Sequence, residues 1–237
     1  TTEIYTPSLP DALLISNIQQ TLDLFETWPE ARDGFGSFVN IVWPLETVPR
    51  RAATTRGCTS GHEIVVGTRC AYVTVFDPYG TYEGLLHEWA HLRCLALGIG
   101  LETHDGEFLC NGDDELCISA IRKDKRRPMS ACLHAFLAWA YLTRADLILA
   151  DLGHADDVRG TVKWNVPKLM EGLLTMKAKA RWTTAGGPFG ERLIEWVEEI
   201  VEGAWDLLGD GERESALAAE RGGRAGGGPG GEGGRAG

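Results

Sequence analysis

Apolar side chains recur at spacings of three and four residues through most of the chain, the pattern of helices with one buried face. Near the start, Leu13, Ile18 and Leu22 share such a face, which predicts a helix from Leu9 to Phe25. The glycines of Gly34–Gly36 then interrupt the pattern. Later in the chain the helical spacing returns and predicts four more helices, at roughly 81–98, 129–150, 163–181 and 189–207.

Between these helical regions, three short runs rich in β-branched and aromatic residues predict strands. They are Phe38–Trp43, which Pro44 ends, Glu63–Val66 and Tyr72–Phe76. The last two, with Gly67 between them, are expected to form a hairpin or to be neighbours in one sheet. The expected fold class is therefore α+β, with a small N-terminal β-sheet followed by a mainly helical bundle.

Composition indicates one folded domain with an appended tail. Of the 237 residues, 43% are hydrophobic, which is enough to build a core. We expect residues 1–208 to form a single domain. Glycine dominates from Gly222 onward, so 209–237 is expected to be a disordered tail, with Gly209–Arg221 fraying into it.

Charge and cysteine content narrow the classes of function. The formal net charge is −11, which repels polyanions, so no nucleic-acid partner is expected. The six cysteines contain no C-x-x-C pair, which favours reduced thiols and a cytoplasmic location. No apolar run has the length of a membrane span and no secretory signal pattern is seen, so no membrane association is expected.

The strongest chemical signal is His87-Glu88-Trp89-Ala90-His91, an H-E-x-x-H motif within the helix predicted at 81–98. Two histidines four residues apart leave the same face of a helix one turn apart, so both imidazoles can bind one metal ion. Glu88, the residue after His87, leaves a different face of the helix, from which it can reach a metal-bound water or one of the metal ligands. The sequence therefore predicts a divalent metal site and an enzyme built around it.

An open metal site needs a third protein ligand, and several candidates follow the motif. A metzincin would place glycine and histidine where this chain has Cys94 and Leu97, so that arrangement is excluded. Glu115 has the spacing of a gluzincin ligand, although it lies in a loop-like context. The other candidates are His104 or Asp105, in a glycine-rich turn, and His134, one turn into an apolar helix; His62 and His154 are expected to be surface residues.

Two chemistries are compatible with these residues. In a zinc peptidase or other hydrolase, Glu88 acts as the general base on a metal-bound water, and Glu115 is the third ligand. With His134 as the third ligand, the site has three imidazoles, a set that suits zinc and iron alike. Ligand type alone therefore does not choose between the two metals.

The motif and the residues that follow it resemble a known family. His87–Arg93, then Arg127-Pro128 and Cys132–Phe136 are similar to the H-E-x-x-H peptide-modification proteins, which are found with ribosomally made peptide natural products. Members are described as iron(II)- and α-ketoglutarate-dependent dioxygenases that hydroxylate the β-carbon of peptide side chains. The similarity spans roughly Phe38 to Leu149, and the glycine- and acid-rich insert from Gly98 to Asp124 departs from it.

The resemblance implies a cofactor, a cosubstrate and a partner. It assigns His87, His91 and His134 to iron(II), with α-ketoglutarate and O2 completing the site. The distal carboxylate of α-ketoglutarate then needs a cation, for which Arg127 is the first candidate and Arg126 the second. Glu88 becomes a group that orients a ligand or water, and the partner is a precursor peptide.

Overall fold

The computed structural model describes most of the chain, namely residues 9–45, 60–65, 68–75, 77–100, 107–112, 114–121, 123 and 125–225. Two helices come first, α1 (Leu9–Glu26) and α2 (Pro29–Phe38). A sheet follows, formed by β1 (Ile41–Leu45), β2 (Ser60–Val65) and β3 (Thr68–Thr74). The strand order is β1-β3-β2, with β1 parallel and β2 antiparallel to the central strand β3.

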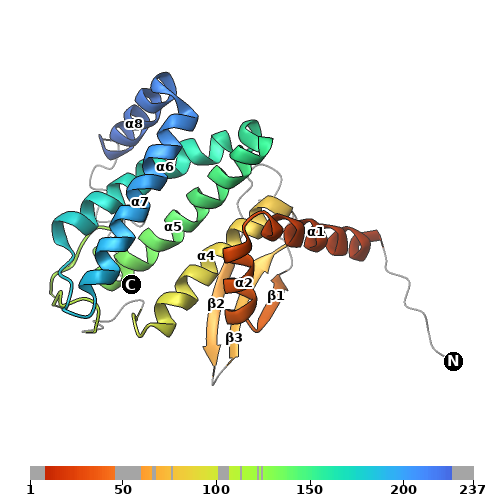
Figure 1. Cartoon of the computed structure of the whole chain (residues 1–237), viewed down its shortest axis with the longest axis horizontal. Coiled ribbons are helices and arrows are strands. Elements are labelled where there is room, and N and C mark those ends of the chain that lie inside the picture. Colours follow the sequence, from red (N-terminus) through yellow and green to blue (C-terminus); the bar gives the residue numbers. More distant parts are fainter. Residues whose placement is uncertain are drawn as a thin grey trace, which may run out of the picture.

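The rest of the described chain is helical. Its elements are α4 (Pro78–Ala96), α5 (Met129–Leu149), the short π-helical turn η1 (Ala150–His154), α6 (Ala155–Lys179), α7 (Gly187–Leu208) and α8 (Asp210–Ala225). Helix α4 lies between the sheet and the bundle, packing on β2 and β3 on one side and on α5 on the other (Figure 1). Helix α5 runs through the middle of the bundle and contacts α4, α6 and α7.

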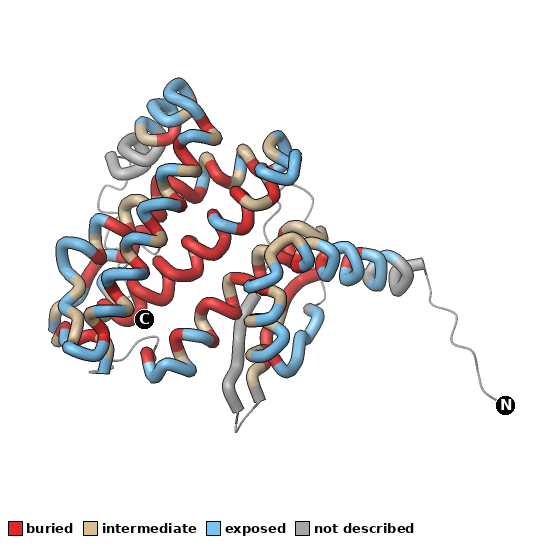
Figure 2. The backbone as a smooth tube through the Cα atoms, viewed as in Figure 1, coloured by how far each residue is buried: buried red, intermediate tan, exposed pale blue. Residues whose placement is uncertain are grey.

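The core is centred on α5, whose side chains are buried on almost every face (Figure 2). This burial explains why its sequence is apolar all round rather than on one stripe. One helical stretch, Met129–Lys179, is by length and composition apolar enough to cross a membrane, but 83% of its most apolar segment is buried inside the protein. This segment thus has the environment of a core helix.

Local signals fix the start and end of α4. The Asp77 carboxylate accepts a hydrogen bond from Gly80 N at 2.9 Å, and Pro78 occupies the first turn. At the other end, Gly98 adopts φ 84°, a left-handed conformation that suits glycine. Gly98 N then donates to Leu95 O at 3.1 Å and Ile99 N to Cys94 O at 2.9 Å, the two bonds of a Schellman cap.

Most of the predicted elements are present, and the α+β arrangement of a small sheet with a helical bundle agrees with the structure. The helix predicted from Leu9 to Phe25 and those at 81–98, 129–150 and 189–207 appear as α1, α4, α5 and α7 with small shifts at their ends. The pairing of Val65 with Thr68 makes β2 and β3 a hairpin, one of the two arrangements expected.

Several predictions were wrong in detail. Leu13, Ile18 and Leu22, predicted to share the buried face of the first helix, are exposed. The glycines at 34–36 do not break a helix but lie inside α2, and α6 begins eight residues before 163, at Ala155. Pro44 does not end a strand: it lies within β1, an edge strand, where a missing N–H is tolerated. The stretch Gly209–Arg221, expected to fray, is largely helix α8, while 226–237 lie outside the described residues. The division into a 1–208 domain and a tail stays a prediction.

Candidate metal centre

Three histidines from two helices meet at the α4–α5 contact. His91 Nε2 lies 3.0 Å from His87 Nε2, one turn earlier on α4. His91 Nδ1 lies 3.0 Å from His134 Nδ1 on α5, and the two rings stack with centroids 5.2 Å apart. The structure thus joins the two histidines of the motif to the one that lies 43 residues after His91.

A backbone carbonyl determines which nitrogen of His134 carries the hydrogen. His134 is fully buried, and its Nε2 lies 2.8 Å from Ile99 O, which can only accept. Nε2 therefore donates, and the lone pair of the neutral ring is on Nδ1, facing His91. His91 Nδ1 donates to it in turn, so the His91 lone pair is on Nε2 and accepts from His87 Nε2. The three rings form one directed hydrogen-bonded chain that starts at His87 and ends at the Ile99 carbonyl.

The donor set fits a divalent transition metal, although its present arrangement is linear. Two imidazole nitrogens that share one ion at about 2.0–2.1 Å lie about 3 Å apart, and both neighbouring pairs have that separation. His91 turns a different nitrogen toward each neighbour, so the three rings do not surround one point. Within the described ranges, no group of three or more His, Cys, Asp or Glu side chains has the geometry of a metal site. Binding of one ion by all three requires His91 to turn one nitrogen toward both partners.

Two further side chains border the cluster. Glu88 is buried, and its Oε1 lies 4.0 Å from His87 Nε2. Trp139 on α5 meets the His87 ring edge-to-face at a centroid distance of 5.7 Å. Trp139 Nε1 is buried and has no hydrogen-bond partner among the described residues.

The structure holds the predicted cosubstrate arginines just before α5. Arg127 exchanges two main-chain hydrogen bonds of 2.8 Å with Cys117, and its side chain is half-buried. Arg126 is exposed. Lys123, four residues before Arg127, forms an ion pair with Glu171 of α6 at 3.1 Å. Lys123 thus connects this segment to α6, and the Arg127 main chain connects it to the loop that carries Cys117.

The alternative third ligand, Glu115, is committed to another interaction. Its Oε2 accepts from Gly112 N at 2.6 Å and pairs with Arg181, which follows α6. These bonds, both made by Oε2, hold the loop that carries Glu115 against the end of α6. His104 and Asp105, the short-spaced candidates, lie outside the described residues.

The remaining predictions concern histidines and cysteines away from the cluster. His154 is exposed, as expected, and lies 3.4 Å from Asp157. His62 pairs with Ala71 as part of β2, and its exposure, predicted to be that of a surface residue, lies outside the described side chains. Cys70, Cys94, Cys110, Cys117 and Cys132 are free thiols, which agrees with the prediction for the described cysteines.

Two features of this region were not predicted from the sequence. The Ile99 carbonyl has no side-chain signature, although Gly98 marked the turn that presents it. A cavity of about 750 Å³ does not lie at the histidines but opens on the opposite face of α4, around Trp89 and Arg93. We assign the chemistry to the histidine cluster because donor atoms meet there.

Comparison with known proteins identified no relative: no family model matches the chain, and no curated protein is similar to it. The family resemblance of the motif therefore stays a prediction.

Proposed function

We propose that this chain is an iron(II)- and α-ketoglutarate-dependent dioxygenase that hydroxylates the β-carbon of a side chain in a ribosomally made peptide. The observation that carries the proposal is the 3.0 Å contact between His134 and His91. The hydrolase alternative used Glu115 as its third ligand, and Glu115 is paired with Arg181 instead. A three-histidine centre is thus better supported than two histidines and a glutamate.

Each residue around the centre has a role in this proposal. His87, His91 and His134 hold the metal, and the Ile99 carbonyl keeps the His134 lone pair on Nδ1. Glu88, buried beside His87, orients that imidazole. Iron(II), bound with α-ketoglutarate and oxygen, supplies the oxidation of a C–H bond.

The cosubstrate needs two further groups. Arg127 is proposed to pair with the distal carboxylate, since a guanidinium binds a carboxylate through two parallel hydrogen bonds. Its main chain is anchored to Cys117, which gives the side chain a defined starting point. Trp139 Nε1 is proposed to donate to an oxygen atom bound beside His87, which would satisfy this buried donor.

The test is succinate formation by the full chain loaded anaerobically with iron(II). On adding oxygen and α-ketoglutarate, we expect succinate, and more of it when a synthetic peptide library is present. His87→Ala should abolish the product, whereas His154→Ala, which changes an exposed histidine, should leave it unchanged. Absence of succinate, together with peptide cleavage that is lost in Glu88→Gln, would replace the proposal by a zinc hydrolase.

A further inference from the structure

A cleft of about 750 Å³ opens among α2, α4, α5 and α7, on the side of α4 away from the histidines. We call it the arginine–aromatic cleft and define it by six of its lining side chains: Trp28, Trp89, Arg93, Tyr141, Arg144 and Trp196. A smaller hollow of about 200 Å³ continues it along α5 and α7, sharing Tyr141 and Trp196. The two together form an elongated depression, and cavities of this size bind ligands in many proteins.

Aromatic rings centred on Tyr141 form the floor of the cleft. The Tyr141 ring lies 4.9 Å from Trp89, 5.7 Å from Trp28 and 5.5 Å from Trp196, centroid to centroid. Burial raises the pKa of Tyr141, while the nearby Arg93 opposes that rise, so the hydroxyl is neutral. The rings come from α4, α5 and α7 and from the residue that precedes α2, so the floor forms where these elements pack together.

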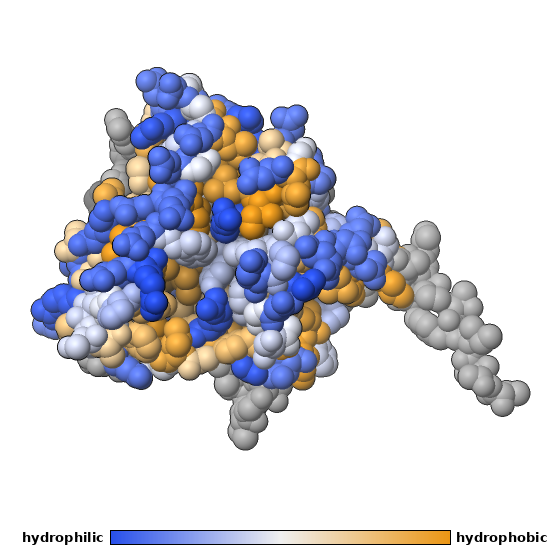
Figure 3. Space-filling model, in the orientation of Figure 1, coloured by the Kyte–Doolittle hydropathy of each residue, from blue (hydrophilic) through white to orange (hydrophobic). Residues whose placement is uncertain are grey.

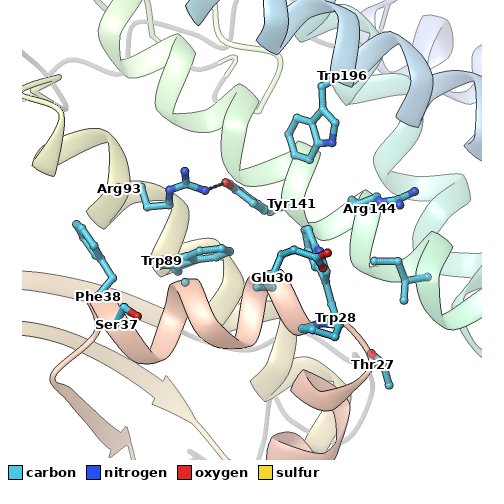
Figure 4. A pocket seen from close by; sticks show the side chains of 14 residues that line it. Thr27, Trp28, Glu30, Ser37, Phe38, Trp89, Arg93, Tyr141, Arg144 and Trp196 are labelled. Carbon is cyan, nitrogen blue, oxygen red and sulfur yellow. Dashed lines mark hydrogen bonds between the residues drawn. The ribbon is translucent and has the colours of Figure 1, made fainter.

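Two arginines enter the cleft from opposite sides (Figure 4). The Arg93 guanidinium donates to Tyr141 Oη and lies 5.1 Å from the Trp89 ring. Among the described residues, neither Arg93 nor Arg144 forms an ion pair with a carboxylate, although Glu30 lies at the edge of the cleft. A guanidinium has five donors, so Arg93 keeps donors for a ligand after bonding to Tyr141.

These positive charges are unusual for the molecule that carries them. The chain has a net charge of −11, yet two arginines face the cleft, and Arg192 lines the adjoining hollow. The face drawn in Figure 3 interleaves hydrophilic and hydrophobic areas instead of presenting one continuous apolar patch. A ligand that matches the cleft must offer both negative charge and apolar side chains.

We propose that the arginine–aromatic cleft binds an acidic peptide segment in which glutamates or aspartates flank aromatic or aliphatic side chains. Trp, Tyr and Arg are the residues that contribute most to peptide and protein binding. The carboxylates pair with Arg93 and Arg144, and the apolar side chains pack on Trp28, Trp89 and Trp196. Nucleic acid also carries negative charge, but the net charge of the chain repels so extended a polyanion. That this segment belongs to the hydroxylated substrate rests on the proposed function; the binding itself does not.

The test is fluorescence anisotropy of a fluorescein-labelled synthetic peptide in which glutamate alternates with leucine and phenylalanine, titrated with the full chain. We expect saturable binding that weakens with salt, and no binding of the same peptide with lysine in place of glutamate. Arg144→Glu, an exposed position, should weaken binding by about tenfold or more. Trp196→Ala should weaken it to a similar extent by removing an aromatic surface.

Lys179→Glu is the matched control, because it makes the same charge change at an exposed position at the end of α6, outside the cleft. Its dissociation constant should stay within about twofold of the unchanged chain. Equal binding of the two peptides, equal effects of Arg144→Glu and Lys179→Glu, or no binding at all would each overturn the proposal. Because the titration uses neither α-ketoglutarate nor oxygen, its result is independent of whether the chain produces succinate.

Discussion

The histidine chain depends on a single backbone atom, the carbonyl oxygen of Ile99. That oxygen holds His134 Nε2 at 2.8 Å and so directs the other nitrogen toward His91. Burying three imidazoles in contact costs folding free energy unless each N–H group has an acceptor. In the directed chain, each N–H that faces a neighbour has one. In the same arrangement, the lone pairs of His91 Nε2 and His134 Nδ1 lie inside the cluster. A metal ion bound there takes the place of a hydrogen shared between two ring nitrogens.

Replacing His134 tests its place in the ligand set. His134→Ala should lower the affinity for added iron(II) or zinc by more than about tenfold, since loss of even an outer partner of a metal ligand has that effect. Isothermal titration of the metal-free chain measures the change. His154→Ala should bind like the unchanged chain, because that exposed histidine lies outside the cluster. Unchanged affinity in His134→Ala would remove His134 from the site.

Thiol reactivity provides a second test at this scale. Burial raises the pKa of Cys94 to about 12, so almost no thiolate is present at neutral pH, whereas Cys110 is exposed. Brief treatment of the native chain with iodoacetamide should label Cys110 and leave Cys94 unlabelled, as mapped by mass spectrometry of the digested chain. In the chain unfolded with denaturant, both should be labelled. Native labelling of Cys94 as fast as Cys110 would contradict the buried position.

Among the elements, α4 has the widest range of contacts. Its histidine face meets α5, while Trp89 and Arg93 on the opposite face line the arginine–aromatic cleft. Helix α2 approaches that second face very closely at Gly34, where an added Cβ would lie 2.4 Å from the Trp89 ring. The glycine is therefore required by packing between helices rather than by the conformation of α2 itself.

A pair of glycine substitutions in α2 tests this close approach. Gly34→Ala should destabilise the chain by about 1–3 kcal/mol, the usual cost of forcing an extra group into a packed contact. Gly36→Ala, in the same helix, has nothing within 4 Å of the added Cβ and should be neutral or stabilise by about 0.5–1 kcal/mol. Chemical denaturation of both variants measures the difference. Equal stability of the two would refute the contact between Gly34 and Trp89.

Across the whole molecule, the C-terminal helix is attached by charge as well as by apolar packing. Glu212 of α8 pairs with Arg159 at 2.9 Å and with Lys163 at 3.7 Å, both on α6. The hydrogen bond from Arg159, with a smaller contribution from the Lys163 charge, holds the pKa of Glu212 below its usual value. Ala216 is buried nearby in the sequence, which places part of α8 in the core.

The lowered pKa of Glu212 gives stability a defined dependence on pH. The folded state favours the carboxylate, so the contribution is complete above the ordinary glutamate pKa of about 4.3 and is lost as pH falls through the lower folded pKa. Glu212→Gln should therefore be less stable than the unchanged chain at neutral pH, and the gap should close in acid. Denaturation midpoints at several pH values measure it. Glu214→Gln, at an exposed position on the same helix, should show no such gap; a gap for Glu212→Gln that is constant in pH would contradict the ion pair.

The sequence by itself determined what depends on neighbours along the chain. Helical spacing of apolar residues predicted α1, α4, α5 and α7, and the four-residue interval placed His87 and His91 on one face of a helix. The predicted range of that helix, 81–98, ends at the glycine that adopts the left-handed turn after α4. These properties follow from backbone geometry over a few residues, so they can be predicted without knowledge of the fold.

Only the tertiary structure decided which faces meet. From the sequence, His134 and Glu115 are both candidates for the third ligand. The packing of α5 on α4 brings His134 to His91, whereas Arg181, 66 residues after Glu115, pairs with that glutamate. In the sequence, the glycines of α2 resemble a helix break. The structure shows that Gly34 instead allows α2 to approach the Trp89 ring. The four helices that line the arginine–aromatic cleft are likewise far apart in the chain. Local periodicity specifies that a face is apolar or polar, whereas its partner is selected by the packing of the whole core, and the candidate sites lie where such faces meet.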